Sequence, residues 1–275
     1  SDREGNSRRE AQSRMNTALP AGALSVTLAL GLIVPVVAFA EVSEEPLLGP
    51  GLRLRPAYDG SATQRAEFVP VVRYYGQHWF VRSTQGVLEG GARIELAPGL
   101  HAGAQLAYES GRKTSESDFL KSHGVPDIKI GASVGVHVEW DHKFGPMPIT
   151  LLARARQHAD SDRGAQADFR LSAGIFQSGR VAAGVFTQAT WADAKSTNSF
   201  YSTPPPQSPT DLPEFSAGSG WLFAGFGLLW SVDLSRDWTV VGSMESRNLR
   251  GDAARSPLAE RTSNYYASAG IAYRL

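Results

Sequence analysis

The chain has 275 residues, 28 glycines, no cysteine and a formal net charge of zero at pH 7. This length allows one or two soluble domains or one medium-sized barrel, and the absence of cysteine excludes disulfides, thiolate catalysis and thiolate metal sites. A balanced charge without a basic run gives no reason to expect binding to nucleic acid.

The N-terminal region has the layout of a secretory signal. Arg8, Arg9 and Arg14 precede an apolar stretch at 21–37, and Ala38-Phe39-Ala40 follows it. The order basic, apolar and small-x-small is typical of a cleaved signal peptide, although an apolar stretch of about 17 residues also reaches the lower limit for a retained membrane helix. We predict that residues 1–40 are an N-terminal extension with a cleaved secretory signal, and that residues 41–275 form the exported domain.

The clearest pattern in the exported part is an alternation of apolar and polar residues over 128–140. Val134 and Val136 fall on one parity, and His137 and Glu139 fall on the other. A period of two is typical of a strand with one apolar face and one polar face. In a soluble sandwich the apolar face would pack on a second sheet, whereas in a transmembrane barrel it would face lipid and the polar face would line the lumen.

The same alternation recurs along the chain, and no helical periodicity competes with it after residue 40. Many segments reach the roughly 9–11 residues that a tilted strand needs to cross a bilayer, whereas strands in soluble proteins usually have about 5 or 6. About twelve strands are predicted, near 50–58, 66–75, 78–84, 86–97, 99–109, 128–140, 148–158, 166–177, 180–192, 219–234, 237–248 and 263–275.

Connection lengths favour the barrel over the sandwich. The long connections, 110–127, 193–218 and 249–262, all follow odd-numbered strands, and short ones such as Pro98-Gly99 follow even-numbered strands. Outer-membrane barrels alternate short periplasmic turns with longer external loops, whereas a sandwich has no reason to sort its loops in this way. We therefore predict an all-β fold, an antiparallel transmembrane β-barrel of about 12 strands with short periplasmic turns and longer external loops. Aromatic residues near strand ends would form its interfacial girdles, namely Tyr58, Tyr108, Trp140, Trp191, Trp221 and Trp238.

Charged residues on the second parity are predicted to line the lumen, because on the lipid face each would cost about 2–4 kcal/mol near the midplane. A narrow interior filled by salt bridges is favoured over a conducting pore. A selective pore usually gathers one sign of charge, whereas here the signs are mixed with a slight basic excess. The candidate lumen charges are Arg53, Arg55, Arg93, Glu95, Glu139, Arg154, Arg156 and Arg170.

The candidate catalytic groups are weak. His158 with Ser161, and Asp160 with Asp162, come nearest to a barrel phospholipase or a rim protease. His158 shares the parity of lumenal residues, however, and Asp-Ser-Asp before Arg-Gly is ordinary turn chemistry. The six histidines show no close metal spacing, and no glycine-rich nucleotide loop precedes a helix. No catalytic residue, cofactor or metal site is predicted, and a rim-active hydrolase is the least favoured function.

Six short motifs recur in the order and spacing of a known family. They are RPAYDGS at 55–61, GVPDI at 124–128, WAD at 191–193, NSFYS at 198–202, LRGDAARSPL at 249–258 and AYRL at 272–275. With these motifs the chain resembles the MipA/OmpV family, the MltA-interacting proteins of the Gram-negative outer membrane. It ends in Leu275, where family members more often end in phenylalanine.

The resemblance implies a non-enzymatic scaffold in the outer membrane of a Gram-negative bacterium, linking a lytic transglycosylase (a murein hydrolase) to a murein synthase. A small-solute channel with a mixed, slightly basic lumen is the alternative. We expect a monomer in the lipid bilayer, without nucleic acid. On the periplasmic side the lead-in 41–49 and the turn 141–148, predicted to be the longest on its side, are available for partners. Exposed aromatic and Met residues suit protein contact, and the candidate contacts are Asp141, Lys143, Phe144 and Met147.

Overall fold

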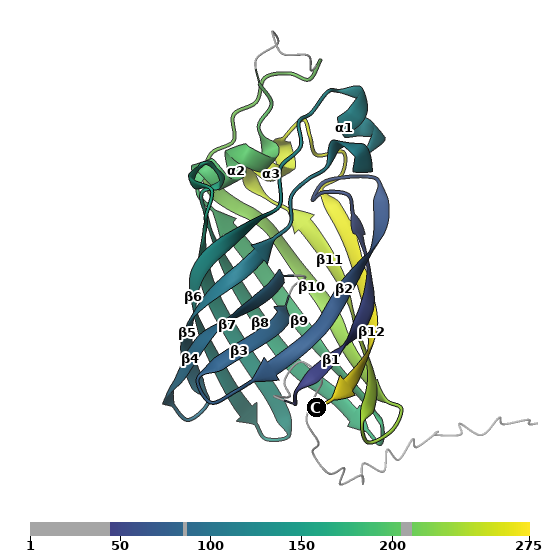
Figure 1. Cartoon of the computed structure of the whole chain (residues 1–275). Coiled ribbons are helices and arrows are strands. Elements are labelled where there is room, and N and C mark those ends of the chain that lie inside the picture. Colours follow the sequence, from purple (N-terminus) through teal and green to yellow (C-terminus); the bar gives the residue numbers. More distant parts are fainter. Residues whose placement is uncertain (1–44, 85–86, 205–210) are drawn as a thin grey trace, which may run out of the picture. The chain divides into compact units, whose positions relative to one another are not determined.

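The computed structural model describes residues 45–84, 87–204 and 211–275, which form a closed antiparallel barrel of twelve strands (Figure 1). Each strand pairs with its neighbours in the chain, and the first pairs with the last to close the sheet. The predicted fold and strand number are confirmed. The predicted signal, the beginning of the lead-in and part of the connection 193–218 lie outside the described residues. No helix of the described part is long and apolar enough to cross a membrane.

Most strands are long enough to cross a bilayer at a tilt, and β3 is the short one. The strands are β1 (Leu47–Pro56), β2 (Gln64–Tyr75), β3 (Trp79–Thr84), β4 (Val87–Ala97), β5 (Leu100–Glu109), β6 (Gly131–Phe144), β7 (Met147–His158), β8 (Ala165–Ser178), β9 (Val181–Ala192), β10 (Gly220–Asp233), β11 (Trp238–Leu249) and β12 (Ser263–Arg274). The helices are α1 (Asp118–Ser122), α2 (Ala194–Tyr201) and α3 (Gly251–Arg255), with single 3-10 turns at Thr114–Glu116 and Ser161–Arg163.

The two faces of the wall follow the parity of the sequence. On β6, Val136 is 60% exposed, whereas the neighbouring His137 is 4% exposed. The exposed parity of the other strands is also apolar and forms a belt around the outside, including Leu52, Leu54, Phe68, Ile94, Leu106, Leu171, Phe226, Met244 and Ile271. An apolar outer belt over a polar interior is the arrangement of a barrel that faces lipid.

The long connections lie at one end of the barrel and the short ones at the other (Figure 1). The described external connections are 57–63, 110–130, 159–164, 193–219 and 250–262, and the periplasmic ones are 76–78, 98–99, 145–146, 179–180 and 234–237. The alternation predicted from the sequence is confirmed.

The periplasmic turn predicted at 141–148 is wrong. Strand β6 continues to Phe144 and β7 begins at Met147, so the loop has only two residues, and 234–237 is longer. Asp, Lys and Pro are common turn residues, but here Lys143 pairs with Pro148 and Asp141 pairs with Thr150 across the ladder. Gly145 adopts φ 59°, a backbone conformation that glycine allows at the first position of a tight hairpin loop.

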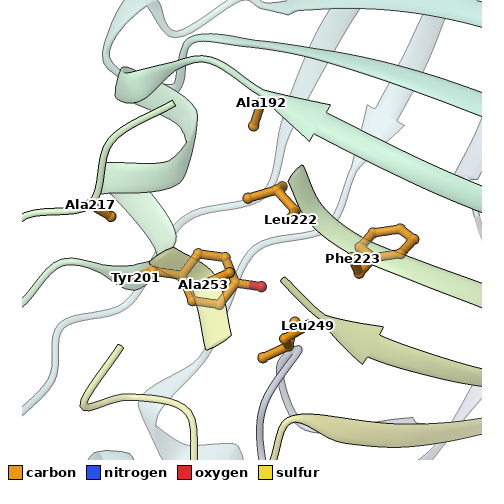
Figure 2. Close-up of a cluster of buried hydrophobic side chains, with 7 residues drawn as sticks. All are labelled: Ala192, Tyr201, Ala217, Leu222, Phe223, Leu249 and Ala253. Atoms are coloured by element: carbon orange, nitrogen blue, oxygen red, sulfur yellow. The ribbon is translucent and has the colours of Figure 1, made fainter. Parts of the chain in front are cut away.

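The helices cap the external end of the barrel. Asp193 begins α2 because its carboxylate accepts a hydrogen bond from the Ser196 backbone at 2.7 Å. Tyr201 at the other end of α2 packs among buried residues of β9, β10, β11 and α3 (Figure 2). This cluster consists of Ala192, Tyr201, Ala217, Leu222, Phe223, Leu249 and Ala253. A second cluster holds α1 over the first external connection and consists of Ala57, Tyr58, Leu120, Val125 and Leu258.

Two residues that the parity of the predicted strands 50–58 and 219–234 places on the lipid side, Tyr58 and Leu222, lie in these clusters instead. Tyr58 follows the end of β1, is buried, and donates its hydroxyl to the Leu258 carbonyl at 2.9 Å. It therefore does not belong to the interfacial girdle. Leu222 is buried because the register of β10 shifts between Trp221 and Phe223, which interrupts the alternation at this point.

Candidate functional site

Most of the candidate lumen charges lie on the inward parity of the wall. Arg154, Arg156, Arg170 and Glu139 are buried. Arg53, Arg55 and Arg93 are half-buried, and the Arg93 guanidinium lies 4.1 Å from the centre of the Tyr75 ring. Glu95 is different, because it is exposed near the periplasmic end, where its carboxylate accepts a hydrogen bond from the Gly99 backbone at 3.1 Å.

Arginines and carboxylates from six strands, β3 to β8, form one buried network. Arg154 donates from Nη1 to Glu89 at 2.6 Å and from Nε to Asp168 at 3.0 Å. Arg156 donates to the same Asp168 at 3.0 Å and to Glu109. Arg82 donates to Glu89 at 2.7 Å and to Glu139. We call these seven residues the Arg154 network: Arg82, Glu89, Glu109, Glu139, Arg154, Arg156 and Asp168.

Neutral side chains satisfy the remaining acceptors of the Arg154 network. Gln105 donates to Glu89 at 2.9 Å, Ser133 donates to Glu109 at 2.6 Å, and Thr190 donates to Asp168 at 2.7 Å. The Nδ1 atom of His137 lies 2.5 Å from the Oε1 atom of Gln105. Buried charges are tolerated when they are paired and hydrogen-bonded in this way, and such a connected network holds its strands in one register.

A second group surrounds Arg247 on the opposite part of the wall. Arg247 pairs with Glu245 at 3.0 Å and with Asp59 at 3.1 Å. Its guanidinium lies 4.0 Å from the Phe223 ring centre and 4.2 Å from that of Tyr266, whose hydroxyl donates to Asp59. Burial of the Asp59 carboxyl opposes ionisation, but Arg247 and the Tyr266 hydroxyl stabilise the carboxylate and keep the pKa of Asp59 below its usual value. These contacts tie the first external connection to β11 and β12.

Arg170 lies beside the Arg247 group. Its guanidinium stacks 3.8 Å from the Phe186 ring centre and donates to Gln188 at 3.1 Å. Gln188 in turn donates to Glu245 at 2.5 Å. A chain of hydrogen bonds therefore runs from β8 through β9 to β11 on the inside of the barrel.

The interior also contains open space between these groups. A cavity of about 240 Å³ has Val69, Val71, Phe186 and Val241 on its apolar side and Arg82, Glu139, Arg170 and Ser172 on its polar side. A second cavity of about 170 Å³ lies beneath the external cap, and a third of about 170 Å³ lies at the periplasmic mouth. Arg53 and Tyr266 line both the first and the second, and Leu47, Arg73 and Val241 line both the first and the third. The cavities therefore adjoin one another along the lumen.

Several central members of these groups were not predicted from the sequence. Asp168 shares the parity of Arg170 on one predicted strand, so that signal was sufficient to place it in the lumen. Arg82 and Arg247 carried no comparable signal, because the predicted strands around them alternate poorly. Within the described ranges, no three His, Asp or Glu residues are grouped so that they could hold a metal ion.

The candidate catalytic residues are not arranged as a nucleophile and its base in the described chain. His158 is buried, and the structure gives no hydrogen bond between it and Ser161. Asp160 accepts a hydrogen bond from the Asp162 backbone at 3.1 Å and so begins the 3-10 turn. These contacts fit turn formation better than the activation of a nucleophile.

The candidate periplasmic contacts lie at the tip of the β6–β7 hairpin. Phe144 and Met147 pair across the two-residue loop and are 54% and 37% exposed. On the outer face, Trp140 stacks on His142 at 5.0 Å, and Phe144 lies 4.7 Å from the same His142 ring. Asp141 accepts a hydrogen bond from Thr150 at 2.6 Å, and Lys143 is exposed. The structure thus brings Phe144 and Met147 together and leaves Asp141 engaged within the wall.

Comparison with protein families gives a match to the model described as MltA-interacting protein MipA over residues 48–275. Among solved structures, an outer membrane channel from Pseudomonas putida F1 has 9% identity and a TM-score of 0.49, and covers 89% of this chain and 100% of its own. The NanC porin has 11% identity and a TM-score of 0.47, with 84% and 100% covered. A bacterial polysaccharide outer membrane secretin has 9% identity and a TM-score of 0.41, with 84% and 99% covered. Comparison with curated proteins gives no match.

Proposed function

Because the chain belongs to the MltA-interacting protein MipA family, we propose that it is a non-enzymatic scaffold for peptidoglycan-remodelling enzymes. It is an outer-membrane β-barrel of a Gram-negative bacterium. The observation that carries the proposal is the family match over residues 48–275, which includes almost the whole barrel. The family's name gives an interaction with MltA, and the proposed partners are a lytic transglycosylase of that kind and a murein synthase. The proposed role requires one copy of the chain and no catalytic residue.

The arrangement of the barrel supports a role on the periplasmic side. Murein enzymes act in the periplasm, so the partner must bind the end that carries the short turns. At that end Phe144 and Met147 form an exposed apolar pair, with the cationic Lys143 beside them. Aromatic and Met side chains at a rigid hairpin tip provide a contact that loses little conformational entropy on binding. We propose this pair, with Lys143 and Asp141 next to it, as the partner contact.

Replacing Phe144 and Met147 together by alanine is expected to lower the retention of a lytic transglycosylase in a pull-down by about tenfold or more, since buried anchor residues of an interface each contribute about 1–2 kcal/mol. The matched control is the double substitution Leu234→Ala and Val181→Ala. These residues lie at other periplasmic turns, and their exposures, 49% and 41%, are similar. Equal retention by both double variants would exclude the hairpin tip. Heat-modifiable gel migration verifies that each variant is folded.

The adjoining cavities support a second candidate function, the passage of small solutes. The Arg154 network and the external cap narrow the lumen, so a scaffold is expected to give no discrete current steps in a planar bilayer. Arg53 is the residue to vary, because it lines two cavities and its nearest carboxylate, Glu67, is 3.8 Å away. Reproducible steps whose size or ion selectivity changes in Arg53→Gln would favour the channel. If protein that heat-modifiable gel migration shows to be folded gives no current steps, the scaffold is favoured.

A further inference from the structure

The cavity beneath the external cap is unusually rich in arginine. Three carboxylates also line it, Asp59, Glu109 and Asp168. Its arginines come from both the barrel wall and the cap, and are Arg53, Arg55, Arg112, Arg154, Arg156 and Arg247. A concave site with this excess of positive charge attracts anions if some of the cations are not already neutralised.

The carboxylates of the cavity are all engaged by other arginines. Asp59 pairs with Arg247. Glu109 pairs with Arg156, and Asp168 pairs with both Arg154 and Arg156. Arg53 and Arg55 share Glu67 at 3.8 Å and 2.8 Å. Among the arginines of the described chain that line this cavity, Arg112 alone therefore has no carboxylate within 4.0 Å.

Arg112 is buried with most of its hydrogen-bonding capacity unused. It is 4% exposed, and its guanidinium donates to the Phe200 carbonyl at 2.6 Å and to the Pro126 carbonyl at 3.5 Å. Its Nε has no hydrogen-bond partner in the part of the chain that the structure describes. A guanidinium carries five N–H donors, and a buried charge without a counter-charge is costly. Burial lowers the pKa of Arg112, and the charge of Asp127, which is not within ion-pair distance, only partly opposes this shift.

Tyr201 adds a hydroxyl donor to the same cavity. It reaches inward from the end of α2 between Leu222 and Leu249 (Figure 2), and it lines the cavity with Arg112. Among the described residues its hydroxyl has no hydrogen-bond acceptor, although the residue is only 5% exposed. A buried tyrosine normally finds a partner for its hydroxyl. Two donors that lack acceptors, one of them cationic, thus line one cavity.

We propose that this cavity is a binding site for a small oxyanion, the carboxylate or phosphate group of a small solute. The planar guanidinium of Arg112 would form the charge-assisted bonds, and the Tyr201 hydroxyl would donate a further bond. The solute would enter from the periplasmic mouth through the adjoining cavities, because the cap covers the external end. The proposal is independent of partner binding at the hairpin tip, and either can fail without the other.

The test is thermal unfolding of the refolded protein in a neutral detergent, titrated with sodium phosphate or sodium acetate. Sodium chloride of equal ionic strength is the reference. A ligand that binds the folded state raises the unfolding temperature in a saturable way. The proposal is supported if phosphate or acetate raises the unfolding temperature in a saturable way and by more than chloride does. The anion that raises it further shows whether the site prefers a phosphate or a carboxylate group. Responses to both oxyanions equal to that of chloride would overturn it.

Arg112→Gln is expected to weaken the oxyanion affinity by at least about tenfold, as expected for loss of a charge-assisted hydrogen bond. The matched control is Arg163→Gln. Like Arg112, Arg163 is a buried arginine of the cap that donates to two carbonyls, those of Lys129 and Ser110. Its Nε also has no hydrogen-bond partner among the described residues. Unlike Arg112, it does not line the cavity. Its variant should keep the parental affinity. Equal affinity in both variants, or equal loss in both, would contradict the assignment.

If Arg112→Gln does not fold, a second pair of variants tests the site without changing the packing of the cap. Tyr201→Phe removes only the hydroxyl and is expected to lower the affinity severalfold. Tyr265→Phe makes the same change on the outer face, where Tyr265 is 66% exposed, and should have no effect. If Tyr201→Phe binds the oxyanion as tightly as Tyr265→Phe, the cavity is not the site.

Discussion

Replacing Arg154 by alanine is expected to lower the free energy of unfolding by about 3 kcal/mol, at the lower end of the range for a broken buried ion pair, because it removes one of the two arginines that pair with each of two buried carboxylates. The side chains of Arg154 and Glu89 are completely buried, and that of Asp168 is 4% exposed. Arg154 donates to both carboxylates. Its loss leaves Glu89 on β4 paired with Arg82 alone and Asp168 on β8 paired with Arg156 alone, so the effect should exceed that of a surface ion pair.

Equilibrium unfolding by urea in lipid vesicles, followed by heat-modifiable gel migration, measures this effect. The control is Arg255→Ala in the external cap. The Arg255 side chain is 69% exposed and pairs with Asp252 three residues before it, so its loss should cost about 0–1 kcal/mol. The triple variant Arg154→Met, Glu89→Gln and Asp168→Asn should recover much of the stability, since no buried charge of this trio is then left unpaired. A loss below about 1 kcal/mol in Arg154→Ala would show that the network is hydrated rather than buried.

The barrel could be predicted from the sequence because its physical cause is periodic. A wall between lipid and a polar lumen forces apolar and polar residues to alternate, and Val136 and His137 show this at adjacent positions. The sorting of long and short connections then gave the two ends of the barrel. Both signals are local in sequence, and neither requires knowledge of which strands are opposite each other.

The contacts inside the lumen could not be predicted in the same way. Arg82 on β3 reaches Glu139 on β6, and Glu89 on β4 reaches Arg154 on β7. Parity places such residues on the inner face, but the partner depends on the stagger of neighbouring strands, which the sequence does not state. The cavity-lining Arg112 lies outside the strands altogether, so no alternation marked it.

The predictions from alternation were wrong at positions where contact with lipid does not decide whether a residue is apolar or polar. At Tyr58 and Leu222 the external cap buries apolar residues that alternation would place in lipid, and a register shift accompanies the second. At the periplasmic end, Asp141 and Lys143 remain in the ladder although they are polar. Strand pairing there extends beyond the hydrocarbon, so hydrophobicity no longer marks where the strand ends.

Arginine at Val136 is expected to lower the free energy of unfolding by about 2–4 kcal/mol, whereas arginine at His142 should cost about 0–1 kcal/mol. The two residues are on the same strand and the same exposed face. Trp140 lies on β6 near the periplasmic interface, and Tyr108, near the external interface, pairs with Ala132 on the same strand. Val136 is therefore midway along β6 between the two aromatic girdles. Urea unfolding of Val136→Arg and His142→Arg in the same vesicles measures the difference.

Val134→Arg and Val138→Arg complete the profile along β6, because a charge on the lipid face is opposed according to its depth. Their costs should fall between those of Val136→Arg and His142→Arg. A symmetrical maximum at Val136 would place the centre of the bilayer there, and Phe144 and Met147 would then lie on the periplasmic side of the interface, where a soluble enzyme can reach them. A maximum at His142 would instead bury the hairpin tip in hydrocarbon and remove it as a partner contact.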